Sequence, residues 1–328
     1  MRIDVHAHLY PPSYLDMLER FGSSAGVGFV RELGGGSAPG EMSGRLAMMD
    51  RASIDLQILS VSSSVPYFAN PQQSIDAARC ANDAYADIIH RYPGRFAAFA
   101  VTPLPHVEAA IAELDRTLSE PGFAGVTTTT EVLGTSIADS RFDQFYAELD
   151  SRRAVLFVHP SGSGIHSPAI ERERLTWSIG APFEDLLCLV QLARAKIPQR
   201  FPHLRIISAH LGGCASFLMD RLAHHDVVPA SRGPQESTLS ADDARWFFYD
   251  TVNGHPAALK CASDTTGVAG LLMGTDIPYN RGAGHQRMVE YIGQSGLDPK
   301  DVAAIYGGNA IRLFGSRLPG YTAQSVPA

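Results

Sequence analysis

The chain has 328 residues, of which 45% are hydrophobic and 19% charged, so it can bury a large core. Its formal net charge of −7, without any Lys/Arg-rich run, argues against a nucleic-acid or anionic-membrane surface. We find neither an N-terminal apolar signal segment nor a run of 18 apolar residues. We therefore expect a cytoplasmic protein without a secretion signal or membrane span.

Eight short runs of apolar or β-branched residues read as strands, and several are continuously apolar, as parallel strands buried on both faces should be. Helical stretches separate most of them, which predicts a single (β/α)8 TIM barrel over residues 1–328 with loop insertions at the active-site end. A doubly wound sheet is the alternative, but the first strand lacks a following Gly-x-Gly-x-x-Gly. The predicted strands are Arg2–His8, Leu56–Ser62, Phe96–Pro103, Gly122–Thr130, Ala154–Pro160, Arg205–Leu211, Trp246–Val252 and Gly270–Pro278.

The segments between the strands divide into predicted helices and predicted loops. The helices are Ser74–Arg91, Pro105–Ser119, Phe142–Arg152, Phe183–Ile197 and a closing helix, Asp301–Phe314. Two segments read as inserted active-site loops, Gly22–Gly44 and Ser161–Gly180. The polar segment Val227–Asp242 is predicted to hold a helix or an interface arm, and the residues after Leu318 to form a tail.

The four cysteines are widely spaced and form no Cys-x-x-Cys pair: Cys80, Cys188, Cys214 and Cys261. This spacing favours reduced thiols in a cytoplasmic protein over a metal-binding or redox motif.

Residues that can bind a metal end four of the eight predicted strands. The first strand ends in His6-Ala-His8, and residues two apart on a strand share a face. His159, His210 and Asp276 end the fifth, sixth and eighth strands. Singly, these three have ordinary explanations as a packed histidine, a helix-entry cap and an Asx turn.

In a parallel barrel, however, all carboxyl ends of the strands meet at one mouth, so the five side chains should converge there. Three imidazoles and one carboxylate suit Zn²⁺, with Mn²⁺ or Fe²⁺ as alternatives, and the fourth histidine is then free to be a base.

The patterns His6-x-His8, Phe-Val-His159-Pro, Ala-His210-Leu-Gly-Gly and Gly-Thr-Asp276-Ile-Pro resemble the amidohydrolase superfamily. Within it, the chain looks like the branch of 2-amino-3-carboxymuconate-6-semialdehyde decarboxylase, with γ-resorcylate, 5-carboxyvanillate and 6-methylsalicylate decarboxylases. The resemblance runs from Ile3 to Phe314.

This resemblance implies a ligand set and a catalytic pair. The positions that match the family's metal ligands are His6, His8, His159 and Asp276. His210 matches a histidine that activates metal-bound water or assists proton transfer, so His210 and Asp276 are the expected catalytic residues. The fourth strand ends in threonines rather than the carboxylated lysine of two-metal hydrolases, so one divalent ion is expected. Zn²⁺ is the first expectation and Mn²⁺ the second.

The resemblance also indicates residues that bind substrate. Arg45 matches an arginine that holds a substrate carboxylate, a role that its residue type fits; the alternative is a solvated helix residue. Arg221 matches an arginine that enters the neighbouring subunit's site, which implies a homodimer; otherwise it is a surface residue. Trp177 resembles an aromatic residue that lines the site, or else packs in the core. Phe183 and Tyr279 are weaker lining candidates.

The activity implied is non-oxidative decarboxylation of an aromatic or unsaturated carboxylic acid. The carbon that bears the carboxylate would be protonated by Asp276 or by a water that His210 orients. The alternative is a mononuclear metal-dependent hydrolase of a lactone, amide or ester, and a purely structural metal-binding barrel ranks third. No organic cofactor is expected, because neither a pyridoxal lysine nor a dinucleotide fingerprint is visible.

Overall fold

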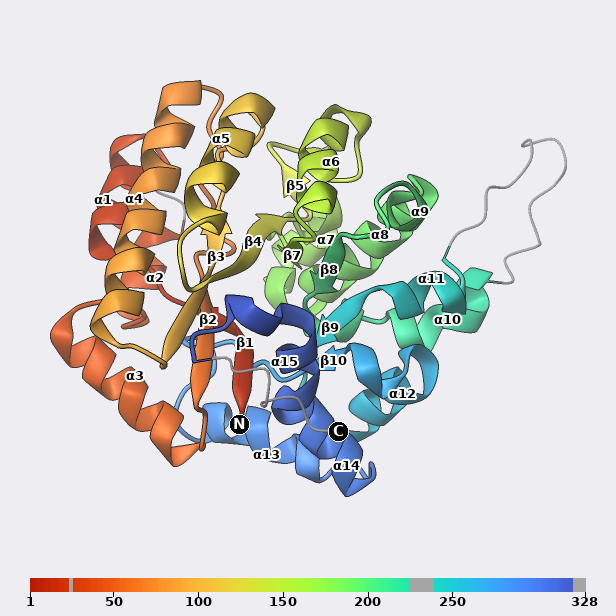
Figure 1. Ribbon diagram of the computed structural model, residues 1–328. Coiled ribbons are helices and arrows are strands. Elements are labelled where there is room, and N and C mark those ends of the chain that lie inside the picture. Colours follow the sequence, from red (N-terminus) through yellow and green to blue (C-terminus); the bar gives the residue numbers. More distant parts are fainter. Residues whose placement is uncertain (24–25, 224–238, 321–328) are drawn as a thin grey trace, which may run out of the picture.

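The structure is a computed structural model that describes residues 1–23, 26–223 and 239–320. Eight parallel strands form one sheet in the order β1-β2-β3-β4-β7-β8-β9-β10. A bridge between Ala7 and Ile277 joins the end of this sheet to its beginning, so the sheet forms a nearly closed barrel (Figure 1). The predicted (β/α)8 barrel is confirmed. The strands are β1 (Ile3–His8), β2 (Leu56–Ser60), β3 (Phe96–Val101), β4 (Phe123–Thr129), β7 (Val155–His159), β8 (Arg205–Ser208), β9 (Phe248–Asp250) and β10 (Leu271–Leu272).

Helices surround the barrel, and the four inter-strand helices predicted from the sequence are confirmed as α4, α5, α6 and α8. The closing helix is divided by a wider turn at Ala304–Gly308 into α14 and α15. Among the described residues, none of the helices has the length and apolarity that a membrane span requires. The helices are α1 (Pro12–Arg20), α2 (Val27–Glu32), α3 (Pro39–Arg51), α4 (Pro71–Arg91), α5 (Val107–Leu118), α6 (Asp143–Ser151), α7 (Pro168–Arg172), α8 (Ala181–Arg194), α9 (Ile197–Arg200), α10 (Ala215–Ala223), α11 (Ala241–Trp246), α12 (Pro256–Thr266), α13 (Ala283–Gly293), α14 (Pro299–Ala303) and α15 (Asn309–Phe314).

The barrel interior is packed with apolar side chains up to the level of the predicted metal site. Phe99 stacks on Phe157 at a ring-centroid distance of 5.2 Å and meets Phe314 of α15 at 6.0 Å. Phe314 belongs to the same buried cluster as the strand residues, so α15 closes one end of the barrel. Phe157 in turn lies 5.1 Å from the His6 ring. These aromatic side chains lie in the barrel interior directly below the site.

The prediction of a loop over Gly22–Gly44 is wrong, since this segment contains α2 and the N-terminal part of α3. Pro39 occupies the start of α3, where its missing N–H costs nothing. The Glu41 carboxylate accepts hydrogen bonds from the backbone N–H groups of Gly36 and Ala38, which caps the helix. The glycine-rich composition concealed these local signals.

Two other predicted segments fall mainly outside the described residues. Of Val227–Asp242, only the last residues are described, and they begin α11. The predicted tail lies beyond the described residues from position 321 onward.

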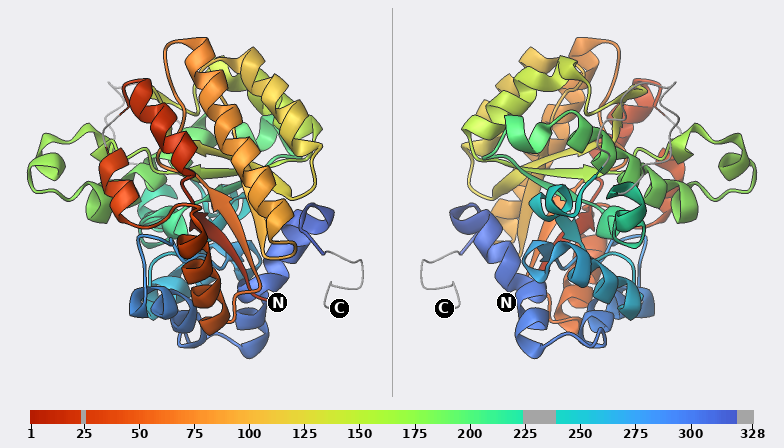
Figure 2. Two further views of the ribbon diagram at one scale, coloured as in Figure 1. Left: turned by 90° about the vertical axis from the view of Figure 1, so that its left-hand side faces the viewer. Right: turned by 90° about the vertical axis from the view of Figure 1, so that its right-hand side faces the viewer.

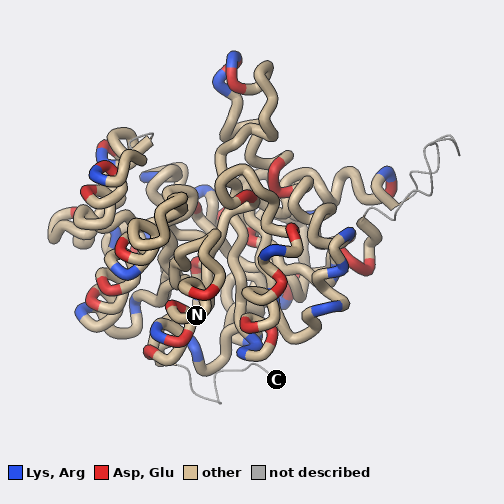
Figure 3. Tube along the Cα trace, turned by 90° about the horizontal axis from the view of Figure 1, so that it is seen from above, with Lys and Arg blue, Asp and Glu red and all other residues tan. Residues whose placement is uncertain are grey.

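The segment that follows β7 carries α7 and stands out from the barrel (green in Figure 2). It corresponds to the predicted insertion Ser161–Gly180, although it contains short helical turns. Viewed from above, the basic and acidic residues of the described chain are interspersed along the same helices (Figure 3). This distribution agrees with the argument against a uniformly basic surface.

Candidate metal centre and active site

A β-bulge in β1 turns both of its histidines into the barrel. Ile3 and Val5 belong to the barrel-interior cluster, so simple alternation would point both His6 and His8 outward. The register with β2 slips between Asp4 and Ala7, because three steps on β1 face two steps on β2. This extra residue shifts the alternation by one position, so that His6 and His8 both point inward.

A buried polar network on the other side of β1 supports the bulge. Asp4 accepts hydrogen bonds from Gln57 Nε2 (2.8 Å) and Thr275 Oγ1 (2.7 Å), linking β1 to its two neighbours. Arg45 of α3 donates to Gln57 Oε1 (3.1 Å) and to the backbone carbonyl of His8 (2.5 Å). Arg45 is only 3% exposed.

Both hydrogen bonds of the Arg45 guanidinium go to the protein itself, behind the strand that carries the histidines. The resemblance implied that Arg45 lies at a substrate carboxylate. The geometry does not place it there. It gives Arg45 a different role, which is to hold the end of β1 in place.

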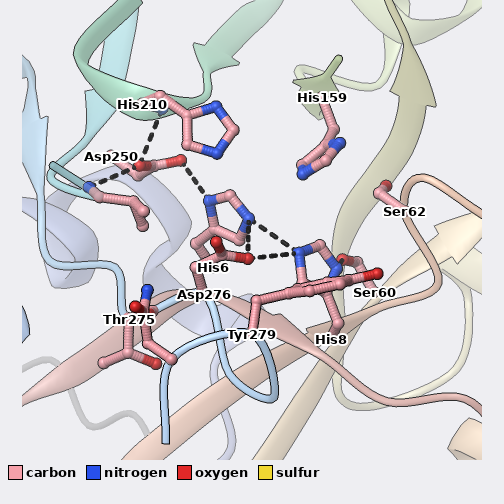
Figure 4. A network of polar contacts seen from close by, with 12 residues as sticks. His6, His8, Ser60, Ser62, His159, His210, Asp250, Thr275, Asp276 and Tyr279 are labelled. Atoms are coloured by element: carbon pink, nitrogen blue, oxygen red, sulfur yellow. Dashed lines mark hydrogen bonds and ion pairs between the residues drawn. The ribbon is translucent and has the colours of Figure 1, made fainter. Parts of the chain in front are cut away.

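The five predicted metal-site residues come together at the mouth of the barrel (Figure 4). His6 Nε2 lies 2.9 Å from His8 Nε2 and 3.4 Å from Asp276 Oδ1, and His8 Nε2 lies 3.0 Å from the same oxygen. The potential ligand atoms of His6, His8 and His159 lie within 4.8 Å of one another, as do those of His6, His210 and Asp276. The first three side chains are almost completely buried.

The partners of the imidazole Nδ1 atoms determine what the Nε2 atoms can do. His6 Nδ1 is 2.7 Å from the Asp250 carboxylate, and His159 Nδ1 is 2.9 Å from the carbonyl of Pro160. Since these oxygens only accept, each Nδ1 carries the proton in the neutral ring and each Nε2 presents a lone pair. Converging imidazole lone pairs beside a carboxylate are the donor set of a divalent transition metal, so these residues fit one.

His8 and His210 are held in the same manner. The Ser60 hydroxyl lies 3.1 Å from His8 Nδ1, and the buried Asp185 carboxylate of α8 lies 3.0 Å from His210 Nδ1. His210 Nδ1 therefore donates, and its Nε2 lone pair faces the other imidazoles. The His210 ring is 5.2 Å from that of His6.

The buried surroundings raise the pKa of one histidine of the site and lower the pKa of two others. Burial alone lowers the pKa of His6, but the Asp250 and Asp276 carboxylates outweigh it and raise the pKa to about 10. Burial lowers the pKa of His8 to about 4 and that of His159 well below its ordinary value. His8 and His159 are therefore neutral at pH 7, whereas without a metal ion His6 holds a second proton on Nε2, which a bound cation would displace.

Two of the site residues have left-handed backbone conformations. His210 has φ of 53° and Asp276 has φ of 59°, a region that histidine and aspartate enter more readily than most residues. The Asp276 amide donates to the carbonyl of His6 at 2.8 Å, which fixes its loop on β1. Such strained positions concentrate at functional sites.

Asp250 and Asp185 hold the rings of His6 and His210, and neither was among the site residues expected from the sequence. Asp250 ends β9, so the strand-end rule that found His159 and His210 could also have found it. Asp185 lies on α8, and no motif marks it. Its contact with His210 spans 25 positions in the sequence and depends on the packing of α8 against the barrel.

A cavity of about 340 Å³ adjoins the candidate metal centre through Tyr279. Phe29, Trp177 and Tyr279 supply aromatic walls, and the Tyr279 ring is 5.4 Å from the His8 ring. Trp177 and Tyr279, both predicted lining residues, are thus found at this cavity. Trp177 packs against Gly162, where even a Cβ would come within 2.8 Å of the indole.

The other two predicted contacts, Phe183 and Arg221, do not line this cavity. Phe183 is 42% exposed near the start of α8. Arg221 is exposed on α10.

Comparison with known proteins places the chain in a family. Residues 3–316 match the family described as Amidohydrolase, and the chain belongs to it. It is 25% identical to 2-amino-3-carboxymuconate-6-semialdehyde decarboxylase of Dictyostelium discoideum, over 96% of this chain and 92% of that protein. It is 26% identical to 6-methylsalicylic acid decarboxylase of Penicillium expansum, over 97% of each chain.

A solved structure supports the same fold. The dihydroxybenzoic acid decarboxylase of Polaromonas sp. JS666, with bound manganese and 2-nitroresorcinol, has a TM-score of 0.78 and 21% identity, covering 95% of this chain and 96% of that one. The family predicted from the motifs is therefore confirmed, and the relatives named here are decarboxylases, that is, carboxy-lyases.

Proposed function

We propose that this protein is a metal-dependent non-oxidative decarboxylase of an aromatic or unsaturated carboxylic acid. The observation that carries the proposal is the convergence of imidazole lone pairs and the Asp276 carboxylate beside a cavity with aromatic walls. The named decarboxylases among its relatives support the reaction class. The aromatic walls favour a planar substrate, because stacked or edge-on rings bury apolar area with defined geometry.

One divalent cation would be held by His6, His8, His159 and Asp276. It would supply Lewis-acid polarisation of a substrate oxygen. At the end of β4, where a carboxylated lysine would bridge a second ion, the Thr127 and Thr128 hydroxyls instead contact Ser62 and Tyr67. This arrangement supports a single ion. We propose Zn²⁺, with Mn²⁺ as the alternative that the manganese-bound relative suggests.

Side chains of this protein would transfer the proton that the reaction requires. Asp185 holds His210 with its Nε2 toward the centre, so His210 can orient a water or pass a proton, and Asp276 can take up a proton and deliver it. The proton adds to the carbon that bears the carboxylate. The bond from that carbon to the carboxylate then breaks, its electron pair restores the conjugated system, and CO₂ leaves.

We also propose a homodimer in which Arg221 of one copy approaches the site of the other. Apolar side chains exposed on the segment leading into α8, on α8 itself and on α10 support this arrangement: Trp177, Ile179, Phe183, Leu187 and Phe217. Gly213, just before α10, packs against Pro182 at the start of α8, so these helices are adjacent. A cytoplasmic location is proposed from the free thiols found at all four cysteines.

The decisive test is product analysis with metal-loaded protein. Hydroxybenzoates should release CO₂, and in D₂O the product should carry deuterium at the former carboxylate position. Ring opening of lactones without CO₂ release would instead establish the hydrolase alternative.

Two histidine variants separate ligand from proton carrier. His159→Ala should lose the metal, whereas His210→Asn should keep most of it and lose turnover. Equal metal loss in both variants would make His210 a ligand, contrary to the proposal.

A further inference from the structure

A directed chain of hydrogen bonds runs from the protein interior to the cavity wall. Tyr10, fully buried after β1, donates its hydroxyl proton to the carbonyl of Ser62 at 2.7 Å. A hydroxyl has one proton, so Tyr10 has none left for a second partner. The Tyr279 hydroxyl lies 2.9 Å from that of Tyr10. Tyr279 must therefore be the donor in this pair and Tyr10 the acceptor.

Tyr279 stands at the place where a substrate would lie. It lines the cavity, remains 39% exposed, and sets its ring nearly perpendicular to that of His8 (Figure 4). The segment Ser63–Val65, directly after the carbonyl that ends the chain of hydrogen bonds, lines the same cavity. With its only proton committed to Tyr10, the Tyr279 oxygen can only accept a hydrogen bond from a bound molecule.

We propose that Tyr279 is a specificity-determining residue whose phenol oxygen accepts a hydrogen bond from a hydroxyl or amino group of the substrate. The nature of the ligand, an unsaturated or aromatic acid, rests on the proposed function. A ligand without such a donor would cover the Tyr279 oxygen and leave it without a partner. Sites built around a hydrogen bond discriminate strongly in this way, because the unpaired group loses its contact with water.

The test compares ligands that differ in one donor. Each hydroxybenzoate isomer is paired with the matching fluorobenzoate, since fluorine is of similar size but has no proton to donate. Binding to metal-loaded protein is measured by calorimetry. For at least one isomer, Tyr279→Phe should reduce the preference for the hydroxyl about five- to tenfold, the equivalent of one hydrogen bond. Equal preferences in wild type and variant for every isomer would overturn the inference.

Tyr10→Phe tests the direction of the hydrogen bonds from Tyr279 through Tyr10 to the Ser62 carbonyl. Without the Tyr10 oxygen, the Tyr279 proton is free to point into the cavity, so the variant should gain affinity for methoxybenzoates, which only accept. The matched control is Tyr146→Phe, which removes another fully buried hydroxyl, one that donates to the carbonyl of Ile137 at 3.0 Å and does not line this cavity. It should leave all preferences unchanged. A shift in Tyr146→Phe as large as that in Tyr10→Phe would argue against the directed hydrogen bonds.

These measurements separate the inference from the proposed function. A wild-type protein that releases no CO₂ but loses its hydroxyl preference in Tyr279→Phe would refute the decarboxylase and retain the role of Tyr279. Release of CO₂ by the wild-type protein, together with an unaltered hydroxyl preference in Tyr279→Phe, would support the decarboxylase and refute the role of Tyr279. Melting temperatures of the variants show that each is folded.

Discussion

Asp250 fixes His6 and, at the same time, the loop that carries His210. One oxygen of its carboxylate accepts from His6 Nδ1, and the other accepts from the backbone N–H groups of His210 (3.0 Å) and Val252 (2.9 Å). These contacts join β1, β8 and β9 at one buried point. A carboxylate behind a ligating histidine sets the ring orientation and raises its basicity.

We expect Asp250→Asn to weaken metal binding by about 10- to 100-fold. The amide can present an N–H to His6 Nδ1, which already carries a proton, or lose the backbone contacts by turning over. Metal affinity is measured by competition with a chelator. Asp264→Asn, which changes an exposed carboxylate paired with Lys260 on α12, is the control and should bind normally. Equal affinities in the two variants would remove Asp250 from the metal site.

His285 of α13 gives a prediction for stability against pH. Burial, with smaller contributions from the Arg45 and Arg51 cations, lowers its pKa from 6.5 to about 4. Between pH 6.5 and 4, His285 therefore binds a proton in the unfolded chain but not in the folded protein. Stability from this group is present above pH 6.5 and decreases as the pH falls, by about 3 kcal/mol at pH 4.

His285→Gln should abolish that part of the acid destabilisation. Free energies of unfolding from urea titrations at pH 7 and pH 4.5 should fall less steeply in this variant than in wild type. His203→Gln, at an exposed position, should follow the wild type. A His285→Gln slope equal to that of wild type would show that the histidine is not the titrating group.

At the scale of elements, the N-terminal half of α8 positions two parts of the site through adjacent residues. Asp185 holds His210, and Glu184 holds the loop that follows β7. The buried Glu184 carboxylate accepts from the backbone N–H groups of Ser161 (2.8 Å), Gly162 (3.2 Å) and Gly164 (2.8 Å). Gly162 is the residue on which Trp177 packs.

Glu184→Gln should therefore loosen one wall of the cavity without disturbing the metal. The amide replaces an acceptor oxygen with a donor that faces other N–H groups, so we expect KM to rise about tenfold through lost charge-assisted hydrogen bonds. Metal content and the pH profile of kcat should stay as in wild type. Glu173→Gln, exposed after α7, is the matched control. A fall in kcat alone would indicate that Glu184 acts through Asp185 and His210 instead.

For the whole molecule, the exposed apolar side chains on α8 and α10 lead to a prediction about assembly. Phe217 is 83% exposed, and a large aromatic residue so placed is typical of an interface. Sedimentation should show wild type as a dimer and Phe217→Glu as a monomer. Leu133→Glu, between β5 (Glu131–Val132) and β6 (Thr135–Ser136), should remain dimeric.

The same assembly assigns a role to Arg221. Arg221→Ala should stay dimeric and lose activity if the arginine of one copy serves the site of the other. A monomeric wild-type protein with full activity would contradict both statements. That residues 1–328 form one domain also stays a prediction.

The amino-acid sequence by itself determined the barrel, its family and the positions that face the metal centre. Eight apolar strands alternating with helices allow few other arrangements, and parallel strands bring all their carboxyl ends to one mouth. His6, His8, His159, His210 and Asp276 could therefore be grouped before any contact was known. Their convergence follows from topology, although their roles as ligands remain the proposal made above.

Only the tertiary structure decided how these side chains are oriented. The bulge that turns His6 inward depends on the register between β1 and β2, and Asp250 meets His6 across 244 positions of sequence. The resemblance implied that Arg45 holds a substrate carboxylate, but packing of α3 directs it to the His8 carbonyl. A local sequence pattern predicts which residues lie at the ends of strands. It does not predict which buried donor forms a hydrogen bond with which distant acceptor.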